Sequence, residues 1–491
     1  MRVMYGVGSI LGAFVLSSGY ASSHVSSPHN SPHNSPHNSP HNSPQSVPPR
    51  TNPLGEPTVP LDARVAKAKT TELVLPTLVN TIVQPLPAIH RISRDASEVP
   101  CSPQSWASAR RAIDLGIARL RATQSASGGW MVGESVAATD QQQRSLAAST
   151  AVTALALKAF AQVDLLPAND ETAKKARALV RERLGGSLAT FNPDADGGLG
   201  NYVASAVTSG LAAVDDPSDR PLIETSVEWL TRQQWDQTEG VSPRMDWFGG
   251  SGYGKWGRPD LSNTQLMLDA LHDAQVSPDD PAVQRALVFL SRTQNLSATN
   301  PATWAQTGPN DGGFVYTPAN GGESFSSEAE GEGRYGEKIP TGQPRSLRSY
   351  GSMTYAGFKS LLYAGLAADD PRVRAAFDWI RNHWTFAENP GVGLQGYFYY
   401  LHALSRALLA ARQDVVTDAS GVTHSWRDEL IAAIVSRQRP DGSWVNDSAR
   451  WEESNPDLCT IYCLLALEEA IKPVRPASPL NPPAPVPQPK Q

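Results

Sequence analysis

Two carboxylates stand close together in the segment DADGG, at Asp194 and Asp196. At this spacing they could share a proton, as acid–base catalysts do, or bind a cation. The same residues suit a tight turn into a helix that we predict from Asn201, because Asp and Gly are favoured in turns and at helix starts. Both alternatives, a catalytic pair and a turn, stay open.

Aromatic side chains gather near the starts of other predicted helices. Their faces could stabilise a carbocation or stack on a sugar ring, although most aromatics in helical proteins fill the core. An arginine beside them could bind an anionic group of a ligand or balance the negative charge of an acidic loop. The candidates for ligand binding are Trp256, Tyr350, Tyr355, Tyr397, Tyr399, Tyr400, His402 and Arg348.

The elements that must position these residues form a repeat. Between Gln104 and Leu467 the chain has, six times, an apolar helix, a Gly-rich break often closed by an aromatic, and a second, more apolar helix. The break is clearest in QSASGGW (124–130) and QRPDGSW (438–444). A period of about fifty to sixty residues predicts an array of helical hairpins, each of which must be covered by its neighbours.

Six hairpins can close into a ring, so we predict an all-α fold, an (α/α)6 toroid of two concentric helix rings at 101–472. The outer helices are amphipathic and the inner ones apolar almost all round. We expect the outer helices at 104–123, 171–183, 219–233, 280–293, 371–383 and 425–437. We expect the inner helices at 140–160, 201–214, 261–274, 349–366, 396–411 and 457–471.

This pattern resembles that of the terpenoid cyclases and protein prenyltransferases, squalene cyclases included, which share the prenyltransferase and squalene oxidase repeat. Their common fold is an α/α toroid with QxxxGxW motifs, and the resemblance covers 104–471. It implies a hydrophobic, isoprenoid-like ligand in the toroid centre. The same architecture also serves glycosidases, polysaccharide lyases and thioester proteins, so the fold alone does not give the chemistry.

In squalene cyclases, a DxDDTA motif begins an inner helix, and its central Asp protonates the alkene. The matching segment here is DLSNTQ from Asp260, with Ser262 and Asn263 in place of the central acids. Protonation-started cyclisation is therefore in doubt. Asp260 remains a catalytic candidate, with helix capping as the alternative.

The zinc ligands of prenyltransferases are not recognisable either. Gly351 and Met353 stand where the resemblance implies Asp and Cys, and Cys459 stands where it implies His. We expect no metal and no cofactor. With Cys101 and Cys463 the chain has three cysteines, too few for a disulfide framework.

The flanking segments suggest export. Residues 1–21, MRVMYGVGSILGAFVLSSGYA, resemble a secretory signal, and no later segment is apolar enough to span a membrane. SPHN units and a Pro-rich linker fill 22–100, a Pro-rich tail fills 473–491, and a polar insertion at 310–348 is long enough to be a lid. We expect a secreted or periplasmic protein, and the net charge of -6 argues against a nucleic-acid partner.

Three functions remain open. The first is a secreted, squalene-cyclase-like toroid that binds a hydrophobic, isoprenoid-like small molecule, with catalysis doubtful. The second is a carbohydrate-active hydrolase or lyase that uses Asp194, Asp196 or Glu452. The third is a non-catalytic envelope scaffold with an unidentified protein partner.

Overall fold

The structure is a computed structural model that describes residues 91–131, 139–184, 199–254, 257–318 and 347–473. The predicted signal, the SPHN units and most of the 310–348 insertion lie outside the described residues, as do Asp194, Asp196 and Trp256. Expectations about these segments and residues stay predictions.

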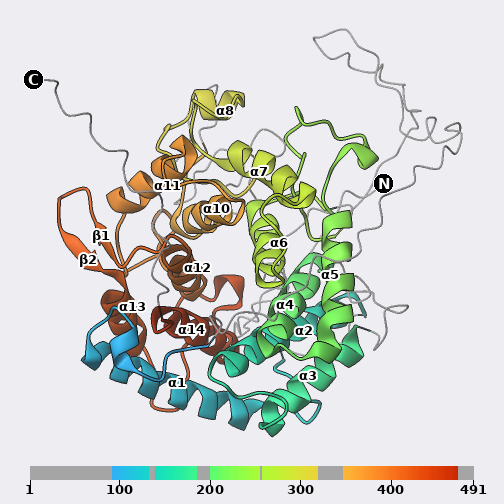
Figure 1. Ribbon diagram of the computed structural model, residues 1–491, viewed down its shortest axis with the longest axis vertical. Helices are drawn as coiled ribbons and strands as arrows, with labels where there is room; N and C mark the ends of the chain where they lie inside the picture. Colours follow the sequence, from blue (N-terminus) through green and yellow to red (C-terminus); the bar gives the residue numbers. More distant parts are fainter. Residues whose placement is uncertain (1–90, 132–138, 185–198, 255–256, 319–346, 474–491) are drawn as a thin grey trace, which may run out of the picture. The chain divides into compact units, whose positions relative to one another are not determined.

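Six of the described helices form an inner ring around a common axis (Figure 1). Each contacts the next in chain order, and the last contacts the first, which closes the ring. They are α2 (Thr139–Gln162), α4 (Gly200–Val214), α6 (Leu261–Asp273), α10 (Gly351–Tyr363), α12 (Tyr397–Ala410) and α14 (Pro456–Ala470).

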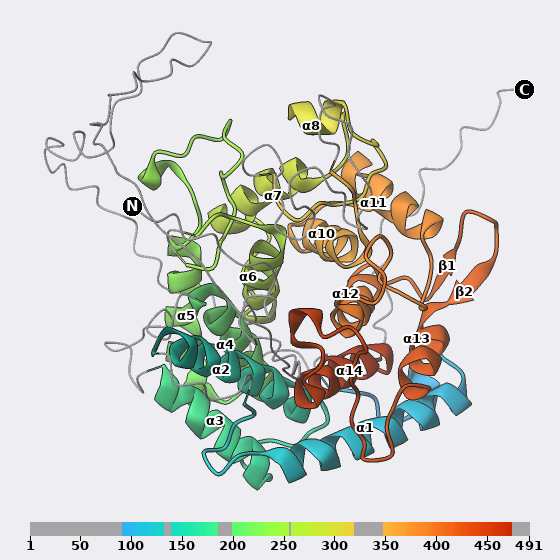
Figure 2. The same ribbon diagram turned by 180° about the vertical axis from the view of Figure 1, so that it is seen from behind.

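Six further helices cover the inner ring from outside, as both views show (Figures 1 and 2). They are α1 (Pro103–Thr123), α3 (Glu171–Arg183), α5 (Arg220–Arg232), α7 (Pro281–Thr293), α11 (Pro371–Asn382) and α13 (Trp426–Val435). The predicted (α/α)6 toroid is confirmed, and every predicted helix is found with its ends within three residues of the predicted ones.

Smaller elements connect the rings. The described residues also form a short helix, four 3-10 turns and one antiparallel hairpin in which Val415 pairs with Ser425. They are α8 (Thr303–Gln306), η3 (Ala96–Glu98), η5 (Pro217–Asp219), η6 (Gln237–Glu239), η7 (Arg450–Glu452), β1 (Val415–Thr417) and β2 (Thr423–Ser425). Within the described residues, no helix combines the length and the apolar character needed to span a bilayer.

The glutamine of the repeat ties neighbouring outer helices together. The Gln124 side-chain amide donates to the carbonyl of Gly128 in its own loop at 2.8 Å and to that of Thr172 on α3 at 2.9 Å. Gln234, Gln294 and Gln438 make the same pair of bonds to a loop glycine and to the first or third turn of an outer helix. We call these four arrangements the Gln–Gly clamps. Gln438 bonds to Ala112 of α1, so its clamp also closes the outer ring.

The glycine of each clamp has no substitute. Gly442 has a φ of +84°, and a Cβ atom there would lie 2.4 Å from the carbonyl oxygen of Leu115 on α1. Gly128, Gly249 and Gly312 share the positive φ and the same close approach to an outer-helix carbonyl. Both the backbone conformation and the space therefore exclude any side chain.

A threonine on an inner helix completes the unit. The backbone N–H of Trp130 donates to Thr153 Oγ1 at 3.2 Å, and that hydroxyl donates to the carbonyl one turn earlier. The other three clamps repeat this bond with Thr264, Thr354 and Thr460. The repeat thus joins each loop to both rings.

Candidate functional site

Three charged side chains meet across the inner ring. Lys158 of α2 lies 2.6 Å from Asp273 of α6, and Arg406 of α12 lies 3.0 Å from the other oxygen of the same carboxylate. Helix α4 separates α2 from α6, and α10 separates α6 from α12. Contacts between helices that are not neighbours can form only at the axis, so these groups lie there.

A second carboxylate of α6 extends this network. Asp269, one turn before Asp273, lies 2.6 Å from Lys359 of α10 and 3.9 Å from Arg406. Lys359 also donates to the side-chain oxygen of Gln265 at 2.7 Å. We call the five charged residues the axial ion cluster: Lys158, Asp269, Asp273, Lys359 and Arg406.

All members of the axial ion cluster are buried. Burial alone would raise the pKa of Asp273, but Arg406 and Lys158 together hold that pKa well below its ordinary value. Burial lowers the pKa of Lys359 to about 8, against the opposing effect of Asp269. The cluster corrects the expectation that the inner helices are apolar almost all round, because they carry charges on the side that faces the axis.

His402 lies one turn before Arg406 on α12. Burial, followed by the nearby cations Arg406, Lys359 and Lys158, lowers its pKa well below the ordinary value, so the imidazole is neutral. Its Nε2 atom is buried and has no hydrogen-bond partner among the described residues. The ring stacks on Tyr462 of α14 at a centroid distance of 5.9 Å.

Tyrosines occupy the half of the axis that is nearer to the N-terminal ends of the inner helices. We call it the N-terminal half and the opposite one the C-terminal half. Gln265 of α6 donates to the hydroxyl of Tyr399 on α12 at 3.1 Å, which is another contact across the ring. Tyr462 packs edge-on against Tyr399 at 5.8 Å, and the Tyr202 hydroxyl donates to Ser262 Oγ at 3.2 Å. We call Tyr202, Tyr399 and Tyr462 the axial tyrosine layer.

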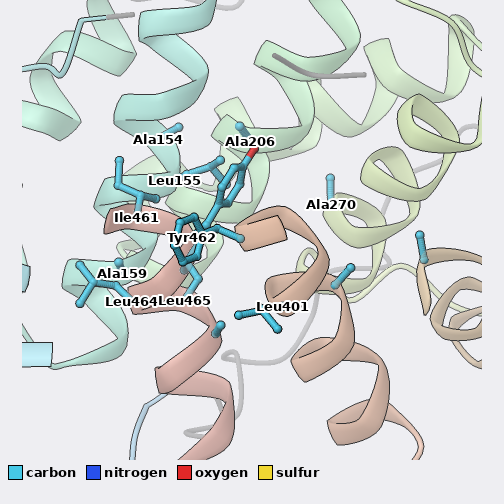
Figure 3. Close-up of a cluster of buried hydrophobic side chains, with 14 of the residues drawn as sticks. Ala154, Leu155, Ala159, Ala206, Ala270, Leu401, Ile461, Tyr462, Leu464 and Leu465 are labelled. Atoms are coloured by element: carbon cyan, nitrogen blue, oxygen red, sulfur yellow. The ribbon is translucent and has the colours of Figure 1, made fainter. Parts of the chain in front are cut away.

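Between the axial tyrosine layer and the axial ion cluster, the side chains that line the axis are largely aliphatic. Figure 3 shows Tyr462 among apolar side chains of several inner helices, with Leu155 of α2 and Ala206 of α4 beside it. Leu155 keeps 8% of its surface exposed and Ala206 keeps 6%, while Leu266, Tyr399 and His402 are only half-buried. Among the described residues, several side chains that line the axis therefore keep some exposed surface.

Asp260 acts as the N-cap of α6. Its two carboxylate oxygens accept from the backbone N–H and the side-chain amide of Asn263, each at 2.8 Å. Burial raises its pKa to about 6, with the Asn263 bonds opposing the rise. The capping alternative is confirmed, and a catalytic role for Asp260 stays a prediction.

A buried glutamate caps α12 from a distant segment. Glu453 accepts from the backbone N–H groups of Phe398 and Tyr399 and from Asn446 Nδ2. Burial raises its pKa to about 7. The N-cap residue of α12 is Gly396, which has no side chain to cap the helix, so Glu453 accepts the N–H bonds in its place.

The backbone is strained at the two residues that precede Glu453. Trp451 and Glu452 both have a φ of +62°, a conformation that costs free energy in residues other than glycine. Glu452 is half-buried, burial raises its pKa, and its carboxylate has no bond to another described residue. Its turn, η7, lies on the inner side of the ring beside α12 and α14 (Figures 1 and 2).

The structure separates the predicted ligand-binding residues into two groups. Tyr399 and His402 lie at the axis. Tyr397 and Tyr400 instead donate to the carbonyls of Phe386 and Thr385 in the loop before α12.

The remaining candidates occupy other places. Tyr355 packs edge-on against Tyr400 at 5.6 Å, Tyr350 is the buried N-cap residue of α10, and Arg348 is exposed.

The axial ion cluster, Gln265, Tyr202 and Tyr462 were not predicted from the sequence. A signal for the charges exists, because Lys158, Lys359 and Arg406 each interrupt an otherwise apolar helical run. Charged residues are almost never fully buried unless they are paired, so such interruptions mark paired sites.

No metal site is evident where the chain is described. No group of three or more His, Cys, Asp or Glu side chains there could hold a metal ion. Cys101, Cys459 and Cys463 are all free thiols. Asp457, which could have joined a zinc site with the last two, accepts from Thr123 at 3.0 Å.

Comparisons with known proteins show no family for this chain. No protein-family model matches the chain, and no curated protein matches it. Similar solved structures include a variant of the type II terpene cyclase MstE from Scytonema in complex with merosterolic acid A, at 15% identity, covering 75% of this chain and 98% of that one, with a TM-score of 0.44.

Carbohydrate-related proteins are similar to the same extent. The GH76A alpha-1,6-mannanase from Salegentibacter sp. HEL1_6 has 10% identity and a TM-score of 0.45, with 74% of this chain and 98% of that chain covered. A D-mannose isomerase has 12% identity and a TM-score of 0.45, with 77% and 100% covered. Similarity this low transfers no activity, and the function must be argued from the axis itself.

Proposed function

We propose that this chain binds an amphipathic, isoprenoid-like small molecule along the axis of its inner ring. One observation carries the proposal. The side chains at the axis change from tyrosine and aliphatic residues in the N-terminal half to the axial ion cluster in the C-terminal half.

Each half suits one part of such a ligand. An isoprenoid chain beside Leu155, Ala206 and the faces of the axial tyrosine layer would leave water, which stabilises binding by roughly 25 cal/mol for each Å² of apolar surface buried. The polar end of the ligand would then face His402 and the axial ion cluster, where hydrogen-bonding groups are available.

The proposal is for binding, not for protonation-started cyclisation. In its contacts with Asn263, Asp260 only accepts hydrogen bonds. With a pKa of about 6 it is mostly ionised at neutral pH, whereas an acid catalyst of alkene protonation must carry its proton.

Calorimetric titration with farnesol tests the proposal. We expect saturable binding with one ligand per chain, and loss of binding in Leu155→Trp, because the larger side chain fills the axis. The matched control is Leu115→Trp, which places the same ring on the exposed side of α1, where Leu115 is 50% exposed. Absence of binding by the wild-type chain, or equal binding by both variants, would contradict the proposal. Thermal melts establish that each variant is folded. If Leu155→Trp does not fold, Ala206→Leu is a second substitution that places a larger side chain at the axis.

A carbohydrate ligand is the second candidate, favoured by Glu452. Its strained backbone, raised pKa and unbonded carboxylate are common features of functional carboxylates. Maltotriose in the same titration tests this candidate: binding by wild type that is lost in Glu452→Gln would support it.

We also propose that the chain is exported, because residues 1–21 have the pattern of a secretory signal. Cell fractionation and N-terminal sequencing test this proposal. A cytoplasmic protein that retains Met1 would contradict it.

A further inference from the structure

We infer that the C-terminal half of the axis recognises an anionic group, the carboxylate or phosphate end of the ligand. The inference rests on the proposed function for the apolar part of the ligand only. The anion is argued separately, from the charges that the inner ring buries.

The axial ion cluster contains one more cation than anions. Lys158, Lys359 and Arg406 are three positive groups, Asp269 and Asp273 are two negative groups, and the difference is one positive charge. All five are at most 6% exposed. A buried charge without a counter-charge is costly, so a cluster of this composition favours a bound anion.

Neighbouring carboxylates in the described part of the chain do not cancel the excess. Glu469 of α14 is paired with Lys472 at 2.8 Å, and together they add no net charge. Glu468 accepts from Gln162 at 2.7 Å rather than from a member of the cluster, and burial raises its pKa well above the ordinary value, which favours its neutral form. The other polar partners of the cluster among the described residues are the neutral Gln265 and Tyr363 hydroxyl, and His272, whose Nδ1 lies 3.7 Å from Asp273.

His402 supplies a hydrogen-bonding atom beside the excess charge. It lies close enough to Arg406, Lys359 and Lys158 for all three to lower its pKa, and its Nε2 has no partner among the described residues. A neutral imidazole with a proton on Nε2 can donate that proton to an anionic oxygen. Hydrogen bonds to ionised acceptors are the stronger kind, so the arrangement favours an anion over an alcohol.

The test compares two ligands that differ only at the polar end. Farnesoic acid and farnesol are titrated into the full chain at pH 7, and we expect the acid to bind about tenfold more tightly. In Lys359→Gln the cluster holds two cations and two anions, and the ratio of the affinities for the acid and the alcohol should fall to about one. In Asp269→Asn the excess is two, and the preference should grow.

A control variant isolates the position of the charge. Lys174→Gln changes the net charge equally, but Lys174 lies on the outer helix α3 with its side chain 62% exposed, and it should keep the wild-type preference. Acetate and inorganic phosphate are also titrated against bound farnesoic acid. Competition by either supports recognition of the anion as such.

The outcomes separate the inference from the proposed function. Equal affinity for acid and alcohol would overturn the inference and leave the proposed function intact. No binding of either ligand would contradict the proposed function. An unchanged preference in Lys359→Gln would place the anion elsewhere and overturn the inference. If Asp269→Asn fails to fold, Lys359→Gln and Lys359→Met decide the question.

Discussion

The contacts between the rings and the contacts at the axis are built in opposite ways. Each Gln–Gly clamp uses the same atoms as the other three: a glutamine amide, two backbone carbonyls, a glycine with positive φ and a threonine hydroxyl. The axial contacts do not follow this repeat: Lys158 pairs with Asp273 across the ring, whereas Lys359 pairs with Asp269 of the neighbouring helix. The difference teaches that repeated contacts determine the fold of this chain, while the axial contacts that fall outside the repeat form its candidate site.

Removing a carboxylate from the axis should have the largest effect on stability. Asp273→Asn leaves both Lys158 and Arg406 without their closest counter-charge, and we expect the free energy of unfolding to fall by about 4 kcal/mol. Chemical denaturation measures the change. Glu171→Gln breaks the exposed pair with Lys174 and should cost less than about 1 kcal/mol. Equal losses in the two variants would show that the buried axial ion pairs stabilise the fold no more than an exposed pair does.

The pH dependence of stability should reveal the cap at the N-terminal end of α12. Glu453 keeps its proton up to about pH 7 when folded, whereas an ordinary glutamate loses it near 4.5. Between these values the folded state binds more protons than the unfolded state, so the free energy of unfolding falls as the pH rises. We expect this group to account for a loss of about 3 kcal/mol, complete above pH 7.

Denaturation at several pH values checks this prediction. The loss should be reduced in Glu453→Gln, while Asp260, with a pKa of about 6, should keep a smaller dependence of the same sign. Glu469, whose pKa Lys472 and other cations hold at about 2 against the effect of burial, contributes with the opposite sign and only below pH 4.5. Identical pH profiles of wild type and Glu453→Gln would refute the assignment.

A single methyl group should break a clamp. Gly442→Ala combines a positive φ with a contact of 2.4 Å to a backbone oxygen, and we expect it to destabilise the chain by about 2 kcal/mol or more. Gly421→Ala is the control, because Gly421 has a φ of +88° but nothing within 4 Å of the added Cβ. Thermal melts should show a clearly smaller loss of stability for Gly421→Ala. Equal losses of stability would show that the contact with the backbone oxygen does not contribute.

Loss of the glutamine should have the smallest effect. Gln438→Leu removes two hydrogen bonds, to the carbonyl of Gly442 and to that of Ala112 within α1, at a cost of about 1 to 2 kcal/mol. Gln124→Leu should cost the same within about 0.5 kcal/mol, because its clamp has the same geometry. Strongly different losses would show that the clamps are alike in shape but not in energy.

The contrast also explains what the sequence could predict. Helix ranges, the number of hairpins and ring closure follow from a signal that is repeated along the chain, in which Gln, Gly and an aromatic recur at each break. The clamp threonines escaped notice because a single Thr in a helix is common. The axis could not be predicted, because Lys158 meets Asp273 only after the ring has closed. Tyr399 and Tyr400 are neighbours in sequence, yet only contacts across the ring show which of them faces the axis.

Mass spectrometry of a solvent extract from the purified chain, produced in a host that makes isoprenoids, tests the central claim most directly. We predict about one equivalent of an amphipathic isoprenoid with an anionic end from the wild-type chain, and none from Leu155→Trp. An extract without lipid, or equal amounts from the two proteins, would contradict the account of the axis as the binding site.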